Sequence, residues 1–319
     1  MRAEIGSQLM SKAFKMRETE ICLLVAHDAG GAEMLASYVV QHKLNCRFVL
    51  EGPALKVFQR KVGAFAVCDL QQGLVEATWC LCGTGWQSDI EWQAIRQAQA
   101  KGMHVVAFID HWVNYPQRFI RHGIQHLPDE IWVGDDYGEA IARQHFPATV
   151  LKVVDNPYLK EVQQEIEALD KTIRARSHKE RRVVFISENL SGHALLQYGD
   201  ANYFGYTEFD ALELLLNNLS YVAENIKELL IRPHPADPLG KYDAFVARYP
   251  DLIKISQGTS LLADIISADV VTGCESMALV IAVMADKKVF SCITIDRPCR
   301  LPHKEILMLK NKALKPSLR

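Results

Sequence analysis

Three features are scarce or missing in this chain of 319 residues: long apolar runs, an excess of one charge, and cysteine pairs with metal-binding spacing. No window of about 18 apolar residues occurs, so a membrane-spanning helix is not expected. The net charge of −2 provides no basic field, so no nucleic-acid partner is expected. Residues 1–20 carry charges throughout and lack the apolar core of a secretory signal, which indicates a loosely held lead-in to a cytoplasmic protein.

The eight cysteines are scattered along the chain and contain no Cys-x-x-Cys pair. Cys80 and Cys82 stand too close together for a zinc knuckle. Others, such as Cys22, lie inside apolar runs that are typical of buried strands. The cysteines therefore indicate reduced, mostly buried thiols in a cytoplasmic protein.

Several motifs that would name a cofactor are also absent. No Gly-x-Gly-x-x-Gly fingerprint implies a nicotinamide, and the turn at 83–85 lacks the Gly-Lys-Ser/Thr ending of an ATP-binding loop. No Gly-x-Ser-x-Gly elbow occurs, which disfavours a serine hydrolase. His122 and His126 have metal-ligand spacing on a helix, but Gly123 and Pro128 weaken that helix. The sequence thus predicts no cofactor and no metal site.

Apolar runs alternate with amphipathic stretches along the first half of the chain. Residues 21–26 predict a buried parallel strand, and the glycine-bearing turn at 27–31 leads into a helix at about 32–42. Ser88 and Glu91 have the spacing of a capping box, which predicts the start of another helix. Further strands are predicted at 47–50, 65–67, 79–82, 104–109, 131–134 and 150–154.

A charged stretch interrupts this pattern near the middle of the chain, and the alternation then restarts. Thr207 is expected to cap a helix at 208–224, and the long polar segment 190–206 indicates a loop that is either a functional lid or disordered. Further strands are predicted at 182–186, 229–231, 252–255, 269–271 and 288–290. The sequence therefore predicts an α/β protein with two Rossmann-like βα domains facing a cleft, as in the GT-B layout. The predicted parts are a lead-in at 1–20, an N-terminal domain at 21–157, a linker helix at 158–180 and a C-terminal domain at 181–319.

Proline stops one of these strands at a basic corner. The run 229–231 ends in Arg232-Pro-His234-Pro235, and the prolines hold the two cationic residues in rigid backbone at the carboxyl end of a strand. A guanidinium beside an imidazole suits an anion such as a phosphate. A proline-capped strand with an exposed arginine and histidine is the alternative.

The turn at 272–276, Thr-Gly-Cys-Glu-Ser, opens a helix of small residues further along the chain. A helix N-terminus offers unpaired N–H groups and a positive dipole end, both of which suit a phosphate, and Ser276 adds a hydroxyl. An ordinary N-cap at Thr272 or Ser276 with no ligand is the alternative. Together with Arg232 and His234, this turn favours a phosphate-binding site.

These two elements carry a resemblance to a known family. A histidine–proline element after a strand, followed by a hydroxyl-bearing turn behind the Ala-Asp-Val-Val of 268–271, resembles the nucleotide-sugar half of GT-B glycosyltransferases. The resemblance is strongest to bacterial sialyltransferases, Kdo transferases and capsule-type enzymes, and the polyglycerol-phosphate transferases share the layout. The stretches 129–136 and 155–158 are similar to the end of the first domain in these enzymes and in UDP-sugar 2-epimerases. The resemblance implies that the phosphate and ribose of the donor are held by Arg232, His234, Pro235, Thr272, Gly273, Glu275 and Ser276.

A catalytic base is expected at a strand end of the first domain. Several sialyltransferase branches carry it in an Asp/Glu-Asp/Glu-Gly motif, of which this chain has no clear copy. Asp28, beside two glycines, is the first candidate to take a proton from an acceptor hydroxyl, and Asp110 is the second. A plain strand–helix turn at Asp28 and a loop-ordering Asx turn at Asp110 are the alternatives.

Aromatic and polar side chains near these two carboxylates suit a sugar acceptor. The expected acceptor residues are His27, His111, Trp112 and Tyr115, although a packed surface loop has the same composition. Glu188, after the first strand of the second domain, is expected either to contact ribose or sugar hydroxyls of the donor or to cap a helix.

The sequence predicts a cytoplasmic, metal-independent glycosyltransferase that moves a sugar from a nucleotide-sugar donor to a surface-glycan or glycolipid acceptor, largely by family analogy. The donor would be a CMP-linked nonulosonate or Kdo, or a UDP-sugar. A nucleotide-sugar 2-epimerase or hydrolase on the same scaffold is one alternative, and a non-catalytic binding protein that keeps the fold is another. A peripheral contact with the inner membrane and the oligomeric state stay open.

Overall fold

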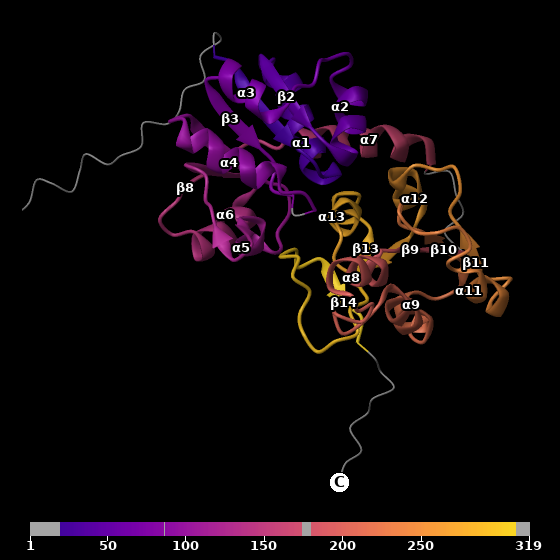
Figure 1. Cartoon of the computed structure of the whole chain (residues 1–319). Helices are drawn as coiled ribbons and strands as arrows, with labels where there is room; N and C mark the ends of the chain where they lie inside the picture. Colours follow the sequence, from indigo (N-terminus) through magenta and orange to yellow (C-terminus); the bar gives the residue numbers. More distant parts are fainter. Residues whose placement is uncertain (1–19, 86, 174–179, 311–319) are drawn as a thin grey trace, which may run out of the picture. The chain divides into compact units, whose positions relative to one another are not determined.

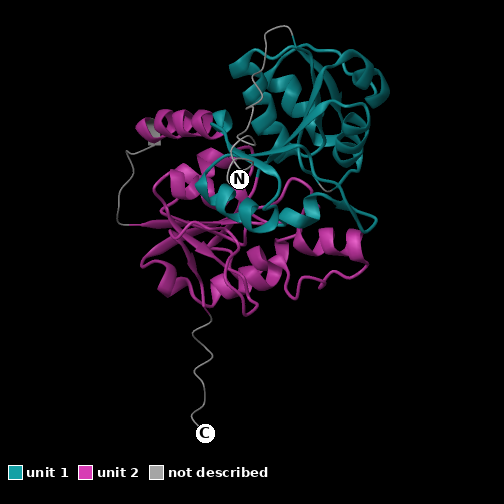
Figure 2. Cartoon of the chain, turned by 90° about the vertical axis from the view of Figure 1, so that its left-hand side faces the viewer, with its two compact units in different colours: residues 1–110, 114–158 teal, residues 111–113, 159–319 magenta. Residues whose placement is uncertain are grey.

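The computed structural model of the chain describes residues 20–85, 87–173 and 180–310 (Figure 1). Residues 1–19 of the expected lead-in, 174–179 of the expected linker and 311–319 lie outside the described residues. The chain divides into two compact units, which Figure 2 distinguishes by colour. Unit 1 runs as far as Asp110 and again from Asn114 to Tyr158, and unit 2 comprises His111–Val113 and the chain from Leu159 onward.

Unit 1 is built around a six-stranded sheet in which every pairing is parallel, in the order β2-β1-β3-β4-β7-β8. The strands are β1 (Cys22–Ala26), β2 (Cys46–Leu50), β3 (Trp79–Cys82), β4 (His104–Ile109), β7 (Glu130–Val133) and β8 (Val150–Val153). The helices are α1 (Ala29–His42), α2 (Gly52–Lys61), α3 (Leu70–Glu76), α4 (Ile90–Ala100), α5 (Tyr115–Arg118) and α6 (Asp136–His145). A small antiparallel pair, β5 (Ile120–Arg121) and β6 (Ile124–Gln125), follows α5.

The central strand β1 shows why this sheet is covered on both faces. All of its residues are buried, as a continuous apolar run in a parallel sheet requires. Leu24 and Ala26 pack into one core with residues of α1 and α2, while Leu23 and Val25 pack into a second core with residues of α3 and α4. Alternation along a single strand therefore serves two hydrophobic cores.

Two local predictions in unit 1 are wrong. Residues 65–67 form no strand of their own, because only Val67 makes a single parallel bridge to Phe48 of β2. Helix α4 has Asp89 at its N-cap position, and Glu91 forms no capping box, because its carboxylate turns inward toward the end of β1. The spacing of polar residues could not reveal that one of them is buried.

Unit 2 contains a second six-stranded sheet, also parallel throughout, in the order β11-β10-β9-β12-β13-β14. The strands are β9 (Arg181–Ile186), β10 (Ile226–Arg232), β11 (Ile253–Ile255), β12 (Val270–Gly273), β13 (Lys288–Ser291) and β14 (Ile306–Met308). Helix α7 (Pro157–Ile173) leads into this unit, and the others are α8 (Leu190–Tyr198), α9 (Glu208–Leu216), α10 (Leu219–Val222), α11 (Asp243–Arg248), α12 (Leu261–Ser267) and α13 (Met277–Met284).

Three features of unit 2 differ from the sequence prediction. The segment 190–206 is not one long loop, because α8 occupies its first half and buries Ala194. The helix predicted at 208–224 is two shorter helices, α9 and α10, although Thr207 caps the first of them in a capping box with Asp210. Strand β14 has no counterpart among the predicted strands, because three residues with mixed burial give no readable period.

Both sheets reverse their strand order at one point. In unit 1, β2 lies on one side of β1 and β3 on the other, and in unit 2, β10 and β12 flank β9 in the same way. At such a switch the connections leaving the two neighbouring strands diverge, and ligands of open α/β sheets bind at the carboxyl ends of those strands. The predicted class, α/β with two Rossmann-like βα domains, is confirmed, and it directs attention to the ends of β1 and β3 and of β9 and β12.

Candidate functional site

The first candidate site lies at the carboxyl end of β1. His27 follows the strand directly, and Asp28 occupies the N-cap position of α1. The Nδ1 atom of His27 lies 2.7 Å from Oδ1 of Asp28, and the two side chains are 17% and 24% exposed. Asp28 makes no capping hydrogen bond to α1, so its carboxylate can hold the imidazole. An imidazole held on one nitrogen by a carboxylate can take a proton on the other nitrogen.

Glycine at the start of α2 leaves room around that second nitrogen. A β-carbon on Gly52 would come within 2.7 Å of Nε2 of His27, closer than real β-carbons approach a neighbour. Gly52 also has a φ of +49°, in the left-handed region that favours glycine. The imidazole is therefore held on its Asp28 side, and the glycine at position 52 places no side chain against Nε2.

Glu91 is the candidate in unit 1 that sequence reasoning missed. The residue is 2% exposed, and its Oε1 accepts the backbone N–H of His27 at 3.2 Å. Its Oε2 is buried and has no hydrogen-bond partner in the part of the chain that the structure describes. Burial, followed by the charge of Asp28, raises the pKa of Glu91 to about 8. The side chain is therefore mostly a neutral acid at pH 7.

The structure brings both candidate bases to the start of α1. Asp110 follows β4, and a β-carbon on Gly30 in the first turn of α1 would come within 2.5 Å of its Oδ2. Oδ1 of Asp110 accepts from Nη1 of Arg118 at 2.7 Å, and the same nitrogen donates to Oγ1 of Thr84 at 2.8 Å. Because Asp110 is committed to a buried arginine, Asp28 is the better placed of the two for a part in proton transfer.

Burial corrects two of the other expected acceptor residues, Tyr115 and Trp112, while the acceptor role of the half-buried His111 stays a prediction. Tyr115 is 2% exposed and stacks on Phe146, so it is a core residue of unit 1 that a sugar cannot reach. Trp112 is 7% exposed, and its ring lies edge-on to His303 within unit 2. Nδ1 of His111 accepts the N–H of Trp112 at 3.0 Å, so this histidine orders its own turn. Aromatic composition alone could not separate packed rings from open ones.

The second candidate site lies at the ends of β9 and β12. Oε1 of Glu188, which follows β9, accepts the N–H of Cys274 at 3.2 Å and that of Glu275 at 2.7 Å. Desolvation raises the pKa of Glu188 to about 7, against the pull of the Glu275 N–H, which favours the ionised form. The sequence predicts a phosphate on the N–H groups that open α13, and the structure places a protein carboxylate there instead.

Glu275 is a framework residue, which corrects its expected contact with the donor. Its buried carboxylate accepts from Nη1 and Nη2 of Arg297 at 2.7 and 2.8 Å, and from the backbone N and Nε of Arg300 at 2.6 and 2.9 Å. Burial alone would raise its pKa, but these hydrogen bonds more than offset it, so the pKa of Glu275 lies below its usual value. A sugar hydroxyl would have to displace an arginine to reach this carboxylate.

The remaining residues of the 272–276 turn have separate roles. Thr272 is fully buried in β12, where its hydroxyl donates to the carbonyl of Val184 at 3.0 Å, so the structure corrects its expected donor contact. Gly273 is required by packing, because a β-carbon would come within 2.9 Å of the carbonyl oxygen of Ile186. Ser276 is the N-cap of α13, and its Oγ is buried and has no hydrogen-bond partner within the described ranges. Its hydroxyl therefore retains unused hydrogen-bonding capacity.

His234 is held in one tautomer by its own turn. Nδ1 accepts the N–H of Ala236 at 3.1 Å, which places the ring proton on Nε2. The backbone N–H of His234 donates to Oδ2 of Asp237 at 2.9 Å, and the exposed Pro235 lies within the same turn. Burial lowers the pKa of His234, so at neutral pH the ring offers a neutral Nε2–H donor and not a cation.

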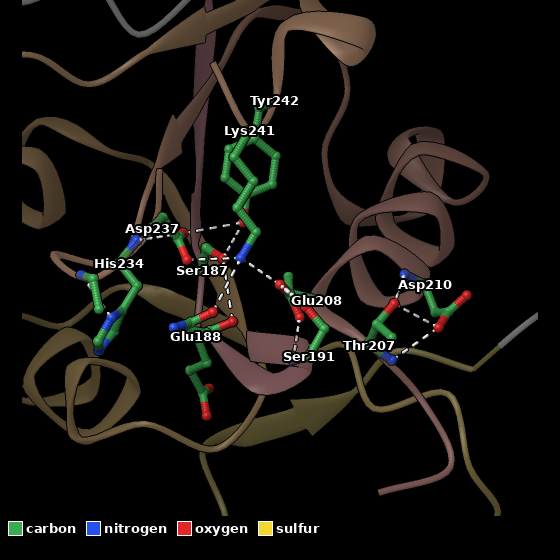
Figure 3. A network of polar contacts seen from close by, with 12 residues as sticks. Ser187, Glu188, Ser191, Thr207, Glu208, Asp210, His234, Asp237, Lys241 and Tyr242 are labelled. Carbon is green, nitrogen blue, oxygen red and sulfur yellow. Dashed lines mark hydrogen bonds and ion pairs between the residues drawn. The ribbon is translucent and has the colours of Figure 1, made fainter. Parts of the chain in front are cut away.

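A buried polar cluster fixes the position of this turn (Figure 3). The Lys241 side chain is 8% exposed, and its Nζ lies 2.7 Å from Oδ1 of Asp237. Nζ also pairs with the carboxylate of the fully buried Glu208. Glu208 accepts both the N–H and the hydroxyl of Ser191, at 2.9 and 2.6 Å. Asp237 thereby ties the histidine turn to α8 and α9, while the carboxylate of Glu188 points away from Lys241 in Figure 3.

Arg232 has an internal counter-ion. Its Nη1 lies 2.6 Å from Oδ2 of the buried Asp264 and donates to the carbonyl oxygen of Thr259 at 3.1 Å. Both partners follow β11, which pairs with β10 on the side away from β9. Nη1 of Arg232 is therefore engaged within the framework of the sheet, and a contact of Arg232 with a donor phosphate stays a prediction.

Three general findings concern the described residues. No group of three or more His, Cys, Asp or Glu side chains there is arranged to hold a metal ion. All eight cysteines are free thiols, five of them buried. No helix in the described ranges is long and apolar enough to cross a membrane.

Comparison with known proteins agrees with the fold. The sequence matches no protein-family model and no curated protein. Among solved structures, a glycosyltransferase from Rickettsia africae ESF-5 aligns with 85% of this chain and 79% of its own, at 9% identity and a TM-score of 0.52. The wall teichoic acid polymerase TagF aligns with 84% of this chain and 69% of its own, at 10% identity and a TM-score of 0.43. The glycosyltransferase SnogD from Streptomyces nogalater aligns with 86% of this chain and 81% of its own, at 9% identity and a TM-score of 0.41.

Proposed function

We propose that this protein is a glycosyltransferase that moves a sugar from a nucleotide-linked donor to a hydroxyl group of an acceptor. The observation that carries the proposal is the His27–Asp28 pair at the strand-order switch of unit 1, where Gly52 places no side chain against Nε2. A hydroxyl group needs such a base to become a nucleophile. The fold shared with the Rickettsia glycosyltransferase supports the reaction class.

In unit 1, the proposal makes His27 the base and Asp28 its partner. Nε2 takes the proton from the acceptor hydroxyl as the oxygen attacks the anomeric carbon and the bond from that carbon to the leaving phosphate breaks. Asp28, 2.7 Å from Nδ1, stabilises the imidazolium that forms. This refines the sequence prediction, in which Asp28 itself takes the proton.

In unit 2, the proposal gives the donor to residues at the ends of β10, β9 and β12, which are neighbours in the sheet. The Nε2–H of His234 and the hydroxyl of Ser276 would bind oxygens of the leaving phosphate. Glu188 would accept hydroxyls of the ribose or sugar with the oxygen that the α13 N–H groups do not use. The donor would be a CMP-linked nonulosonate or Kdo, or a UDP-sugar, and no metal ion takes part.

A thermal-shift screen against CMP, CDP, UDP and GDP tests the donor half. A nucleotide at about 100 times its dissociation constant stabilises the folded protein by roughly 2.7 kcal/mol, which raises the unfolding temperature by a few degrees. The shift should shrink in His234→Ala and Ser276→Ala. It should persist in Ser220→Ala, a matched control on the exposed side of α10.

The nucleotide-sugar that matches the best nucleotide is then incubated with the protein alone and with candidate hydroxyl acceptors. Transfer to an acceptor, with little turnover of donor alone, is the expected result. Rapid release of free sugar or epimer from donor alone would favour the hydrolase or epimerase instead. Tight nucleotide binding with no turnover under any condition would favour a binding protein.

A further inference from the structure

A buried acid, Glu91, lies beside the His27–Asp28 pair. It belongs to the first turn of α4, and its Oε1 holds the backbone N–H of His27. Two glycines after β3 make room for its carboxyl group. A β-carbon on Gly83 would come within 2.5 Å of Oε1, and one on Gly85 within 2.8 Å of Oε2. Larger residues at either position would drive the acid from its place.

Asp28 also lies beside Gly85. A β-carbon on Gly85 would come within 2.5 Å of Oδ2 of Asp28 as well as within 2.8 Å of Oε2 of Glu91, so these two carboxylate oxygens lie on the same side of Gly85. Two ionised carboxylates in such a place repel each other. Oε2 of Glu91 has no donor among the described residues, so a proton on it removes the repulsion and provides a donor on the side of Asp28.

The surroundings of Glu91 favour this neutral form. Burial and the charges of Asp28 and Asp110 raise its pKa to about 8, and only backbone N–H groups oppose the shift. The nearest arginines are engaged elsewhere, since Arg118 pairs with Asp110 and Arg121 with Asp89. The titratable and charged groups around the acid are Asp28 at the start of α1, His27 through its backbone, Cys82 in β3, Asp110 after β4 with Arg118 of α5, and Asp89 with Arg121 of β5.

We propose that Glu91 is a positioning residue for the transfer: as a neutral acid, it holds the backbone of His27 with one oxygen and the carboxylate of Asp28 with the other. This inference rests on the function proposed above. When His27 takes the proton of the acceptor, the positive imidazolium is stabilised by the negative charge of Asp28. The neutral Glu91 adds no second negative charge. Ionisation of Glu91 places a second negative charge against Asp28 and removes the donor, so the pair loses its alignment.

The first test uses the full chain without ligand, so it does not depend on the reaction. The ring carbon signal of His27, assigned by its loss in His27→Gln, is followed by NMR from about pH 6 to about pH 10. We expect an inflection at about pH 8 in the wild type, from ionisation of Glu91. Glu91→Gln and Glu91→Met should lack this inflection, and Glu188→Gln should keep it. An inflection that persists in both Glu91 variants, or a wild-type signal without one, overturns the proposal.

The second test requires turnover of a CMP-, CDP-, UDP- or GDP-linked sugar. The ratio of the transfer rate at about pH 9 to that at about pH 7 should fall roughly tenfold in the wild type and less than about twofold in Glu91→Gln. An equal fall in both proteins overturns the positioning role. If the ligand-free inflection behaves as expected but none of these sugars is turned over, the proposed function fails and takes the positioning role with it. The neutral state of Glu91 would stand in that case.

Discussion

Glu91 in unit 1 and Glu188 in unit 2 make the same kind of bridge in opposite directions. In unit 1, the carboxyl group comes from the helix after β3 and holds a backbone N–H at the end of β1. In unit 2, the carboxyl group comes from the end of β9 and holds backbone N–H groups that open the helix after β12. Both bridges cross the point where the strand order of the sheet reverses.

The two glutamates occupy similar positions in their sheets, but the charged groups around their carboxyl groups differ. Glu188 receives N–H groups from a helix N-terminus, and the carboxylate beside it, Glu275, is neutralised by two arginines. Glu91 faces Asp28 and Asp110, and among the described residues only Asp110 pairs with an arginine. For this reason the proposal assigns the hydroxyls and phosphate of the donor to unit 2 and the transfer of a proton to unit 1.

The largest expected effect comes from removing the base in unit 1. His27→Gln should lower the transfer rate by roughly 100- to 10,000-fold, because a hydroxyl loses its proton acceptor. The measurement is nucleotide release from the donor in the presence of acceptor. His42→Gln, at the exposed C-terminal end of the same helix α1, is the matched control and should retain the wild-type rate. Equal rates in wild type and His27→Gln would show that His27 is not the base.

The next largest effect concerns the stability that the buried polar cluster gives to unit 2. Lys241→Met leaves the buried Glu208 and Asp237 without their cation and should cost about 3–5 kcal/mol of unfolding free energy. Urea unfolding followed by circular dichroism measures it. Lys227→Met, which breaks an exposed pair with Glu180, is the control and should cost less than about 1 kcal/mol. A loss of similar size in the two variants would contradict the role given to the cluster.

The pH dependence of stability tests the environment of Glu188. The folded-state pKa of Glu188, about 7, lies above its usual value of 4.5, so the folded protein holds an extra proton between these values. Stability from this group is therefore present below about pH 4.5 and is lost as the pH rises to about 7. Glu188→Gln should flatten the wild-type decline in unfolding free energy over that range, by a few kcal/mol at most. An unchanged slope would place Glu188 in a more polar setting than the structure gives it.

The smallest effect concerns metal ions. The proposal assigns the leaving phosphate to His234 and Ser276, so a chelator such as EDTA should change the transfer rate by less than about twofold. The rate is measured before and after dialysis against EDTA, with added magnesium as the control. A large loss that magnesium restores would show that donor binding in unit 2 needs a cation.

The sequence predicted the fold well because its signals are local. Continuous apolar runs such as 21–26 mark buried strands, and glycine or proline at their ends marks turns, so the alternation of two βα domains can be read directly. The errors fall on short elements. Three-residue strands such as β14 have too few positions to show a period.

The positions of some candidate residues could be predicted because they stand at strand ends. His27 and Ser276 are examples, since each adjoins a strand-order switch, while their functional roles stay predictions. Glu91 was missed because its contact with His27 spans 64 positions of the chain, which spacing cannot reveal. Thr272 and Tyr115 were overvalued because residue type does not show whether a side chain faces the core.

The division of work between the units can be tested by titrating the best-binding nucleotide into His27→Gln and His234→Ala by calorimetry. The account predicts that His234→Ala weakens binding by about tenfold or more, through loss of a hydrogen bond to the phosphate, while His27→Gln binds within about threefold of the wild type. Equal weakening in both variants, or wild-type binding in His234→Ala, would contradict the assignment of the donor to unit 2 and of the base to unit 1.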